Sequence, residues 1–182
     1  MRYGKIILVC FVAILLASCS GSRKAHRGAP AVQQPAKPTP GAKERPVRYL
    51  DQPVDLDRNE FVGYAKRFLG TPYKYASADP AKGFDCSGLL YHVFGHFNIK
   101  TPRASYDYEH LGQEVSATKA RTGDLILFTG EKSNKVGHIG IVTDNGNGGL
   151  NFIHASTSRG VIISKLSGYY QQHFVKVIRI LE

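Results

Sequence analysis

Apolar residues recur at helical spacing in two segments of the middle of the chain. The first segment, residues 57–70, carries apolar side chains three and four positions apart, can be capped by Asp57 or Asn59, and ends at Gly70. The second begins near Asp85. The pattern predicts two amphipathic helices, with inward-facing residues Phe61, Tyr64, Ala65, Phe68 and Leu69 in the first and Leu89, Leu90, Val93, Phe94 and Phe97 in the second.

Beyond residue 120 the pattern changes to short β-type runs separated by turn residues. A short helical turn is expected just before them, at 105–112. Two helices followed by several strands with tight turns are typical of the α+β class with an antiparallel sheet. The predicted strands are residues 125–128, 138–142, 150–155, 161–164 and 174–181.

One predicted hairpin brings two histidines together. The Asn- and Gly-rich segment 145–149 supplies residues that tolerate positive φ, so the strands on either side of it should pair. If the reversal centres near Gly146, His138 and His154 stand directly opposite each other on one face, with Cβ atoms about 5 Å apart. A slip of one residue would place them on opposite faces.

The start of the chain has the pattern of an export signal. Two basic residues precede the apolar run 6–16, which is shorter than the roughly 20 residues of a bilayer span. The run ends in LASC, which resembles the lipobox of bacterial lipoproteins. The resemblance implies a signal peptide over 1–18, a diacylglycerol on Cys19 and, because Ser20 follows, an anchor in the outer membrane facing the periplasm. An ordinary signal with a chance cysteine is the alternative.

Residues 19–50 connect this anchor to the domain predicted over 51–182. Their Pro, Ala, Gln and Lys content, without an apolar period, predicts a disordered tether. Of the formal net charge of +10, residues 20–48 carry +6 and the signal carries +2, which leaves +2 for the domain. Nucleic acid is therefore not expected as a partner. Contact with anionic lipid or cell-wall polymer and a plain solvated linker both fit the tether.

Cys86 would be the one free thiol of a mature chain acylated on Cys19. An unpaired cysteine in an oxidising compartment is either a buried apolar residue or a reactive group. Cys86 falls in the first turn of its helix, where unpaired amides and the helix dipole favour a thiolate. With His138 as general base and His154 orienting it, the three residues fit a Cys–His–polar triad, and amides at the helix start could stabilise an oxyanion.

Four segments in a fixed order carry a family resemblance. FDCSGLL, GDLILF, GHIGIV and FIHAS resemble the NlpC-type family of cell-wall cysteine peptidases over about residues 57–180. Its members are papain-like bacterial enzymes that cut peptidoglycan stem peptides, typically at the γ-D-glutamyl–diamino acid bond. The resemblance implies N-terminal helices packed on an antiparallel sheet, with Cys86 as nucleophile, His138 as base and His154 as the third polar residue. No cofactor or metal is expected.

Further site residues follow from the same resemblance. Tyr73, in the segment GTPYKY, matches a tyrosine near the nucleophile, and Tyr75 stands where the family often has another aromatic residue. Asp85 and Ser87 match residues that hold the free amine of the stem's terminal L-alanine, although Asp85 could instead serve only as a helix cap. Arg103 is either a structural hydrogen-bond donor or a contact to substrate.

Three positions depart from the family pattern. Ala76 and Ser77 stand where two glycines are common, and Tyr108 stands where glutamine is usual. All three are expected near the substrate groove, so they bear on specificity rather than on the chemistry.

A competing signal lies on the second helix. His92 and His96 are four residues apart, the spacing of a two-histidine metal site. No glutamate follows His92, and both side chains fall on the face away from the apolar stripe. A solvated pair is therefore the favoured interpretation.

The sequence thus predicts a lipid-anchored cysteine endopeptidase acting on peptidoglycan. Its expected partners are the stem peptide and, through Cys19, a membrane; no oligomeric state is indicated. Two other functions fit the same residues: a catalytically silent peptidoglycan-binding module and an acyltransferase. The presence of Cys86, His138 and His154 argues against the silent module.

Overall fold

The computed structural model describes residues 48–50 and 53–182 of the chain. Its helices are α1 (Arg58–Lys66), α2 (Cys86–His96) and α3 (Tyr169–Gln172), with the 3-10 turns η1 (Ser105–Tyr108) and η2 (Ala117–Lys119). Its strands are β1 (Arg48–Tyr49), β2 (Ala78–Asp79), β3 (Gly83–Phe84), β4 (Ile99–Lys100), β5 (Gln113–Val115), β6 (Leu125–Thr129), β7 (Val136–Gly146), β8 (Gly149–Ser156), β9 (Gly160–Lys165) and β10 (Phe174–Arg179).

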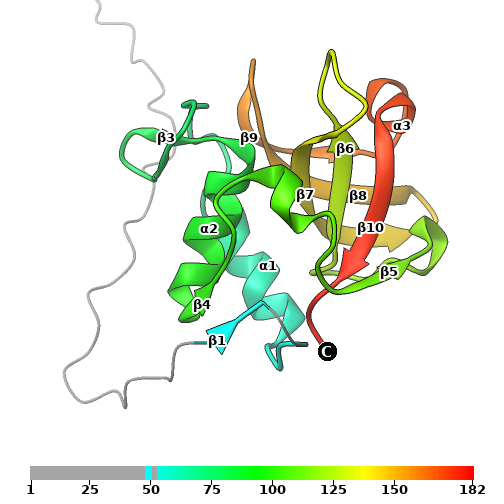
Figure 1. The fold of residues 1–182 in the computed structure, drawn as a ribbon, viewed down its shortest axis with the longest axis horizontal. Helices are drawn as coiled ribbons and strands as arrows, with labels where there is room; N and C mark the ends of the chain where they lie inside the picture. Colours follow the sequence, from blue (N-terminus) through cyan, green and yellow to red (C-terminus); the bar gives the residue numbers. More distant parts are fainter. Residues whose placement is uncertain (1–47, 51–52) are drawn as a thin grey trace, which may run out of the picture. The chain divides into compact units, whose positions relative to one another are not determined.

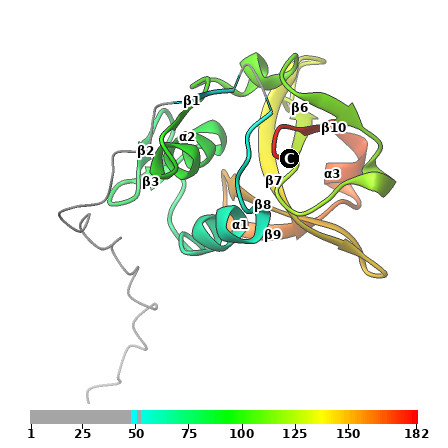
Figure 2. The same cartoon turned by 90° about the horizontal axis from the view of Figure 1, so that it is seen from below.

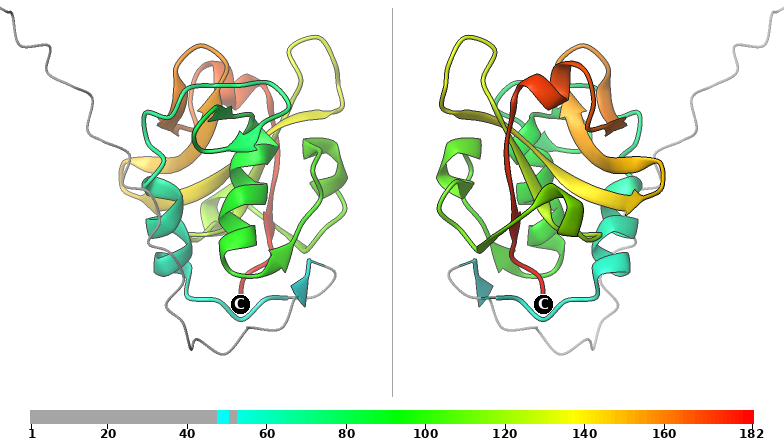
Figure 3. Two further views of the ribbon diagram at one scale, coloured as in Figure 1. Left: turned by 90° about the vertical axis from the view of Figure 1, so that its left-hand side faces the viewer. Right: turned by 90° about the vertical axis from the view of Figure 1, so that its right-hand side faces the viewer.

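The central element is an antiparallel sheet of six strands in the order β5-β10-β6-β7-β8-β9 (Figure 1). Helices α1 and α2 lie on one side of it, and α3 lies on the other (Figure 2). The two views of Figure 3 show α2 in front on one side and β10 with α3 in front on the other. The α+β fold with helices packed on an antiparallel sheet is therefore confirmed.

Each face of the sheet has its own apolar cluster. On the helix side, Ile139 and Ile141 pack with residues of α1 and α2 such as Phe61. On the α3 side, Phe128 and Phe152 pack beside Tyr170, Phe174 and the other members of a smaller cluster. Alternate residues of β7 thus contribute to opposite faces, as the period of a strand requires.

The two long helices form where the sequence places them, because each has a local cap. The Asp57 carboxylate accepts the Glu60 N–H at 2.7 Å, and the Asp85 carboxylate accepts the Gly88 N–H at 2.6 Å. The predicted inward-facing residues are buried, with one exception. Leu69 lies beyond the end of α1 and its exposed fraction is 41%.

The predicted strands are present, and β7 is longer than expected. Elements β5 and α3 were not predicted. Strand β1, which precedes the predicted domain boundary at 51, begins at Arg48 and pairs in parallel with β4, and Leu50 is buried. The predicted signal peptide, Cys19 and the predicted tether up to residue 47 lie outside the described residues. Within the described ranges, no helix is long and apolar enough to cross a membrane.

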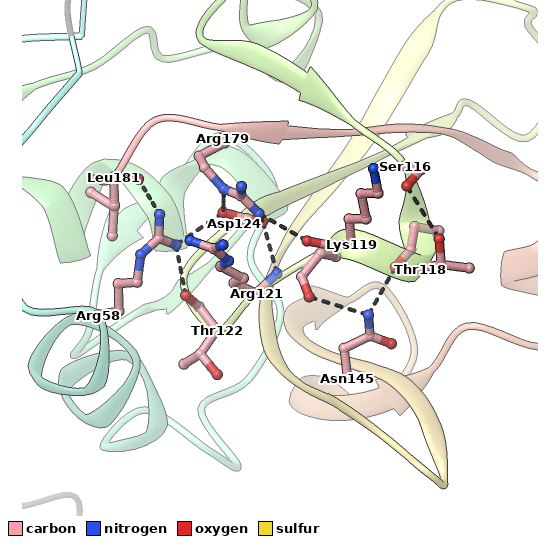
Figure 4. A network of polar contacts seen from close by, with 12 residues as sticks. Arg58, Ser116, Thr118, Lys119, Arg121, Thr122, Asp124, Asn145, Arg179 and Leu181 are labelled. Atoms are coloured by element: carbon pink, nitrogen blue, oxygen red, sulfur yellow. Dashed lines mark hydrogen bonds and ion pairs between the residues drawn. The ribbon is translucent and has the colours of Figure 1, made fainter.

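A buried ionic cluster joins the first helix to the last strand (Figure 4). Asp124, from the segment GDLILF, is fully buried. Its carboxylate accepts hydrogen bonds from Arg58 Nη1 at 3.0 Å, from Arg179 Nε at 3.0 Å and Nη2 at 2.7 Å, and from the Arg121 amide at 2.8 Å. Arg58 also donates to the carbonyls of Thr122 and Leu181. The aspartate of this motif therefore holds α1, β6 and β10 together.

Candidate active site

Cys86, the first residue of α2, lies where two pockets meet. One pocket, of about 530 Å³, extends toward α3, and the other, of about 390 Å³, extends toward Arg103. Cys86, Tyr73 and Gly137 line both pockets. The Cys86 side chain is half-buried, and its Sγ lies 4.0 Å from the carbonyl oxygen of Gly137. The sulfur is therefore accessible to a ligand from two directions.

His138 and His154 form a hydrogen-bonded pair that lines the larger pocket with Cys86. Nε2 of His138 lies 2.9 Å from Nδ1 of His154. Both rings lie on the α3 face of the sheet: His138 stands opposite Phe128, and His154 contacts Phe152. Helix α2 packs on the other face of the sheet, and Cys86 at its start approaches the histidines at the end of β7, beside Gly137.

The register of the hairpin differs from the prediction, but a bulge still places both histidines on one face of the sheet. Near the turn Gly146 pairs with Gly149, whereas Ile141 pairs with Ile153, because the register shifts by one residue between Val142 and Asp144. The two histidines are therefore diagonal neighbours rather than directly opposed. If the register of the pairs near the turn continued along the whole hairpin, the two histidines would lie on opposite faces. The shift therefore makes their hydrogen bond possible.

Two hydroxyl groups complete the polar chain behind the histidines. Nε2 of His154, which is fully buried, lies 3.0 Å from Ser164 Oγ and 3.2 Å from Tyr170 Oη. Neither residue was predicted from the sequence. Ser164 could have been found from the β8–β9 pairing, which places Ile162 opposite His154 and Ser164 one step along the same face. Tyr170 belongs to α3, which the sequence pattern does not indicate.

The electrostatics of the site favour neutral groups in the resting protein. Burial lowers the pKa of His138 to about 4 and that of His154 to about 3, with the charges of His138 and Arg159 adding to the effect on His154. Both imidazoles are thus neutral near pH 7.

Burial, together with the Asp85 carboxylate, raises the pKa of the Cys86 thiol. The backbone amides of Ser87, Ile139 and Cys86 itself act in the opposite direction, but they are outweighed. The expectation that the helix start holds a thiolate is therefore wrong for the resting protein. Its sulfur is a thiol beside a neutral histidine pair, so ionisation requires transfer of the proton to a base.

Asp85 and Arg103 form a two-bond ion pair in the smaller pocket. Arg103 Nη1 and Nη2 lie 2.8 and 2.7 Å from the two carboxylate oxygens of Asp85. Ser87 Oγ donates to the Arg103 carbonyl at 2.6 Å and accepts from its Nη1 at 3.0 Å. Asp85 thus acts both as the cap of α2 and as the partner of Arg103, and the structure brings these three predicted residues together.

The aromatic residues predicted near the site have different surroundings. Tyr73 is half-buried between the two pockets, and burial with the neighbouring Cys86 raises its pKa. Tyr75 lines the smaller pocket with 81% of its surface exposed. Tyr108 is fully buried and donates to the Pro102 carbonyl at 3.0 Å. Its side chain lines neither pocket, whereas Ser105 and Tyr106 of the same turn line the smaller one.

The glycine-rich position of the family has a conformational reason. Ala76 has a φ of 55°, in the left-handed region that glycine adopts most readily. The neighbouring Ser77 carbonyl lies against α2, where a Cβ added to Gly88 would be 2.0 Å from its oxygen. Gly88, in the segment FDCSGLL, is therefore needed for this close approach.

Of the second histidine pair, His96 is exposed as predicted, whereas His92 is half-buried. The His96 ring stacks on Tyr64 with 3.8 Å between centroids. His92 is half-buried against Phe68 and Phe84, and burial lowers its pKa. Over residues 48–50 and 53–182, no group of three or more His, Cys, Asp or Glu side chains could hold a metal ion. The pair is part of an aromatic cluster between α1 and α2.

A cysteine at the start of a helix, beside a histidine pair at the end of an antiparallel sheet, defines the class of papain-like proteins with a cysteine–histidine site. Comparison with protein families gives the particular group: residues 70–179 match the model of the NlpC/P60 family, and the chain belongs to that family.

Individual relatives agree with this assignment. The chain is 32% identical over 174 residues to the murein DD-endopeptidase MepS/murein LD-carboxypeptidase of Escherichia coli K12. This alignment covers 93% of this chain and 88% of the relative. It is 34% identical over 119 residues to the gamma-DL-glutamyl hydrolase of Bacillus subtilis, covering 65% of this chain but only 28% of that protein. An NlpC/P60 family structure from Bacillus cereus superimposes with a TM-score of 0.62 at 28% identity, over 73% of this chain and 43% of the other.

Proposed function

We propose that this protein is a cysteine endopeptidase that hydrolyses peptidoglycan stem peptides and is held by a lipid on Cys19 at the outer membrane, facing the periplasm. The observation that carries the proposal is the position of Cys86 between two pockets, beside a neutral histidine pair. The peptidoglycan substrate is supported by relatives whose names describe murein peptidases. The anchor is supported by the lipobox-like segment LASC.

In the proposed mechanism, His138 removes the thiol proton. Its Nε2 is bonded to His154, so Nδ1 is the nitrogen left for the Cys86 thiol. As the sulfur attacks the substrate carbonyl, Nδ1 takes the proton, and the amides at the start of α2 stabilise the oxyanion. His138 then gives this proton to the leaving amine. Water, activated by the same nitrogen, hydrolyses the thioester and regenerates the thiol.

The polar chain behind His138 stabilises its charged form. When His138 is protonated on both nitrogens, its Nε2–H must donate to Nδ1 of His154. The proton of His154 is then on Nε2, where the oxygens of Ser164 and Tyr170 can accept it. His154 thus orients the base, and the two hydroxyls hold His154 in the tautomer that the reaction needs.

Two pockets on either side of the sulfur support cleavage within a peptide. A substrate bound across Cys86 can place residues in the smaller pocket, beside Asp85 and Arg103, and in the larger pocket, beside His154. By the family resemblance, the Asp85 side takes the amino-terminal part of the stem. The larger pocket then takes the residue that supplies the leaving amine.

The γ-D-glutamyl–diamino acid bond is the first candidate for the cleaved bond. A second candidate is the D,D bond of a peptidoglycan crosslink, favoured by two observations. The relatives that match nearly the whole chain are named DD-endopeptidases. In addition, both carboxylate oxygens of Asp85 are bonded to Arg103, so its negative charge is already paired with a guanidinium and attracts a substrate amine less strongly.

The test uses purified cell wall with the wild-type protein and Cys86→Ala. We expect the wild type to release peptide fragments and Cys86→Ala to release none, while its unfolding transition is unchanged. Activity in Cys86→Ala would overturn the mechanism. A wild-type protein that binds cell wall without releasing fragments would support the silent module, and transfer of the acyl group to an added amine in preference to water would support an acyltransferase. Digestion of defined stem and crosslinked peptides identifies the bond.

The anchor is tested separately. Metabolic labelling with a fatty acid should label the full-length chain and not its Cys19→Ser variant, and fractionation should place the wild type in the outer membrane. Absence of lipid on the wild type would overturn this part of the proposal and leave the peptidase part unaffected.

A further inference from the structure

The larger pocket contains an arginine that the proposed chemistry does not use. Arg159 lines this pocket together with Cys86, His138 and His154, and its side chain is exposed. Its positive charge also contributes to the low pKa of His154. Among the described residues, no ion pair joins Arg159 to a carboxylate.

The turn that carries Arg159 is held in place. The next residue, Gly160, has a φ of +70°, and a Cβ there would lie 2.3 Å from the Thr71 carbonyl oxygen. The Val161 amide donates to the same oxygen at 2.8 Å, and the Gly70 amide donates to the Val161 carbonyl at 2.9 Å. The backbone at Arg159 is therefore fixed beside the pocket, and only its side chain has to become ordered when a ligand binds.

We propose that Arg159 binds a carboxylate of the substrate residue that supplies the leaving amine. This inference rests on the proposed function, because it takes the larger pocket as the leaving-group side. A guanidinium binds a carboxylate through two parallel hydrogen bonds, and it does so best where water is partly excluded. Arg159 is exposed in the free protein, so the bound substrate residue itself would have to exclude this water from the pocket.

The inference selects one class of diamino acid. In both candidate bonds the diamino acid supplies the leaving amine. A diamino acid with two carboxyl groups keeps a free carboxylate after both of its chain bonds are formed, whereas lysine and ornithine offer none. Arg159 therefore favours a 2,6-diamino dicarboxylic acid over a diamino acid with one carboxyl group.

Glu131 is the other charged side chain that lines this pocket. It lines the pocket together with Tyr169 and Tyr170 of α3. It would repel a carboxylate nearby but would attract an ammonium group. A substrate residue that carries both groups suits a pocket with one cation and one anion, and no ion pair between Arg159 and Glu131 is formed in the described part of the chain.

The experiment compares two soluble substrates that differ only in this carboxylate. One contains the diamino dicarboxylic acid with its second carboxylate free, and the other has the same carboxylate converted to the amide. We expect the wild type to prefer the free acid by about tenfold or more in kcat/KM, since a hydrogen-bonded charge pair is lost in the amide. Arg159→Gln should reduce this preference to about twofold or less, and Arg159→Lys should give an intermediate value.

The matched control is Lys132→Gln, which removes an exposed positive charge that does not line the pocket and should keep the wild-type preference. The ratio between the two substrates cancels any general effect of Arg159 on the pKa of His154. Equal wild-type rates on both substrates, or an unchanged preference in Arg159→Gln, would overturn the inference while the peptidase function stands. If the wild type hydrolyses neither substrate nor purified cell wall, the proposed function fails instead.

Discussion

Two aspartate–arginine clusters lie at different places in this fold, and each belongs to a short motif. Asp124 is completely buried, and its arginine partners Arg58 and Arg179 expose 17% and 20% of their side chains. Asp85 exposes 11% of its side chain at the edge of a pocket, and its partner Arg103 exposes 39%. The residue types are the same, but the surroundings are not.

The difference separates a structural role from a functional one. The two arginines that pair with Asp124 come from α1 and β10, elements far apart in the sequence, so its charge cannot be moved without unpacking α1 from β10. The Asp85–Arg103 pair faces solvent and lines the pocket beside Cys86, so a ligand can compete for it. A motif residue therefore has to be placed in the fold before its role can be assigned.

Asp124→Asn should have the largest effect on stability. The substitution removes a buried negative charge and leaves two arginines facing a neutral amide, which typically costs about 3–5 kcal/mol in the free energy of unfolding. Urea denaturation of the domain measures this cost. Specific activity of the protein that remains folded should be unchanged. Asp144→Asn, on the exposed part of β7, serves as the control, and a loss below 1 kcal/mol at Asp124 would contradict the structural role.

Acidification should destabilise the active-site end next most strongly. The folded-state pKa values of His138 and His154, about 4 and about 3, lie below the unfolded value of about 6.5. The unfolded chain therefore binds more protons, and the contribution of the pair is complete above pH 6.5 and is lost as the pH falls toward 4. The free energy of unfolding, measured by urea denaturation from pH 7.5 to 4, should fall by a few kcal/mol. It should fall less steeply in the double variant His138→Gln, His154→Gln. Equal slopes would show that other groups cause the loss.

Ala76→Gly should have a smaller effect, of the opposite sign. A non-glycine residue in the left-handed region costs roughly 1 kcal/mol, and glycine recovers most of it against its greater freedom in the unfolded chain. We expect a gain of about 0.5–1 kcal/mol by thermal or urea denaturation. Ala78→Gly, in β2 with ordinary strand geometry, should instead lower stability. Losses at both positions would mean that residue 76 is not strained.

Asp85→Asn should change stability least and activity substantially. Asparagine still caps α2, and the lost ion pair is partly exposed, so the cost is about 1 kcal/mol or less. Because Arg103 loses its partner inside the pocket, kcat/KM on a stem peptide should fall by about tenfold or more. Asp79→Asn breaks the exposed ion pair with Lys82 outside the pockets and should change neither property. A large stability loss with unchanged kcat/KM at Asp85 would remove the contrast with Asp124.

The parts of the fold that sequence analysis predicted are those with local causes. The start of each helix follows from its own capping aspartate, and the buried positions follow from a period of 3.6 residues. Short sequence motifs identify four of the site residues, namely Cys86, His138, His154 and Asp85. What could not be predicted depends on packing: the burial of Tyr108, the hydroxyls of Ser164 and Tyr170, and the raised pKa of Cys86 arise where distant segments meet.

The register shift in β7 has a consequence for how this hairpin can vary in length. The shift lies between Val142 and Asp144, on the catalytic side of the turn at Asn147 and Gly148. Residues added to the turn can extend as a loop without disturbing the imidazole pair. Thr143 is the extra residue of this shift, because Val142 pairs with Phe152 and Asp144 pairs with Asn151. Its deletion would leave a regular ladder with the same pairs, so the two rings would stay on one face. A single deletion between His138 and Val142, by contrast, would turn His138 to the other face of the strand and separate the rings. Insertions at the tip and loss of Thr143 should therefore preserve peptidase function, whereas loss of one residue between His138 and Val142 should abolish it.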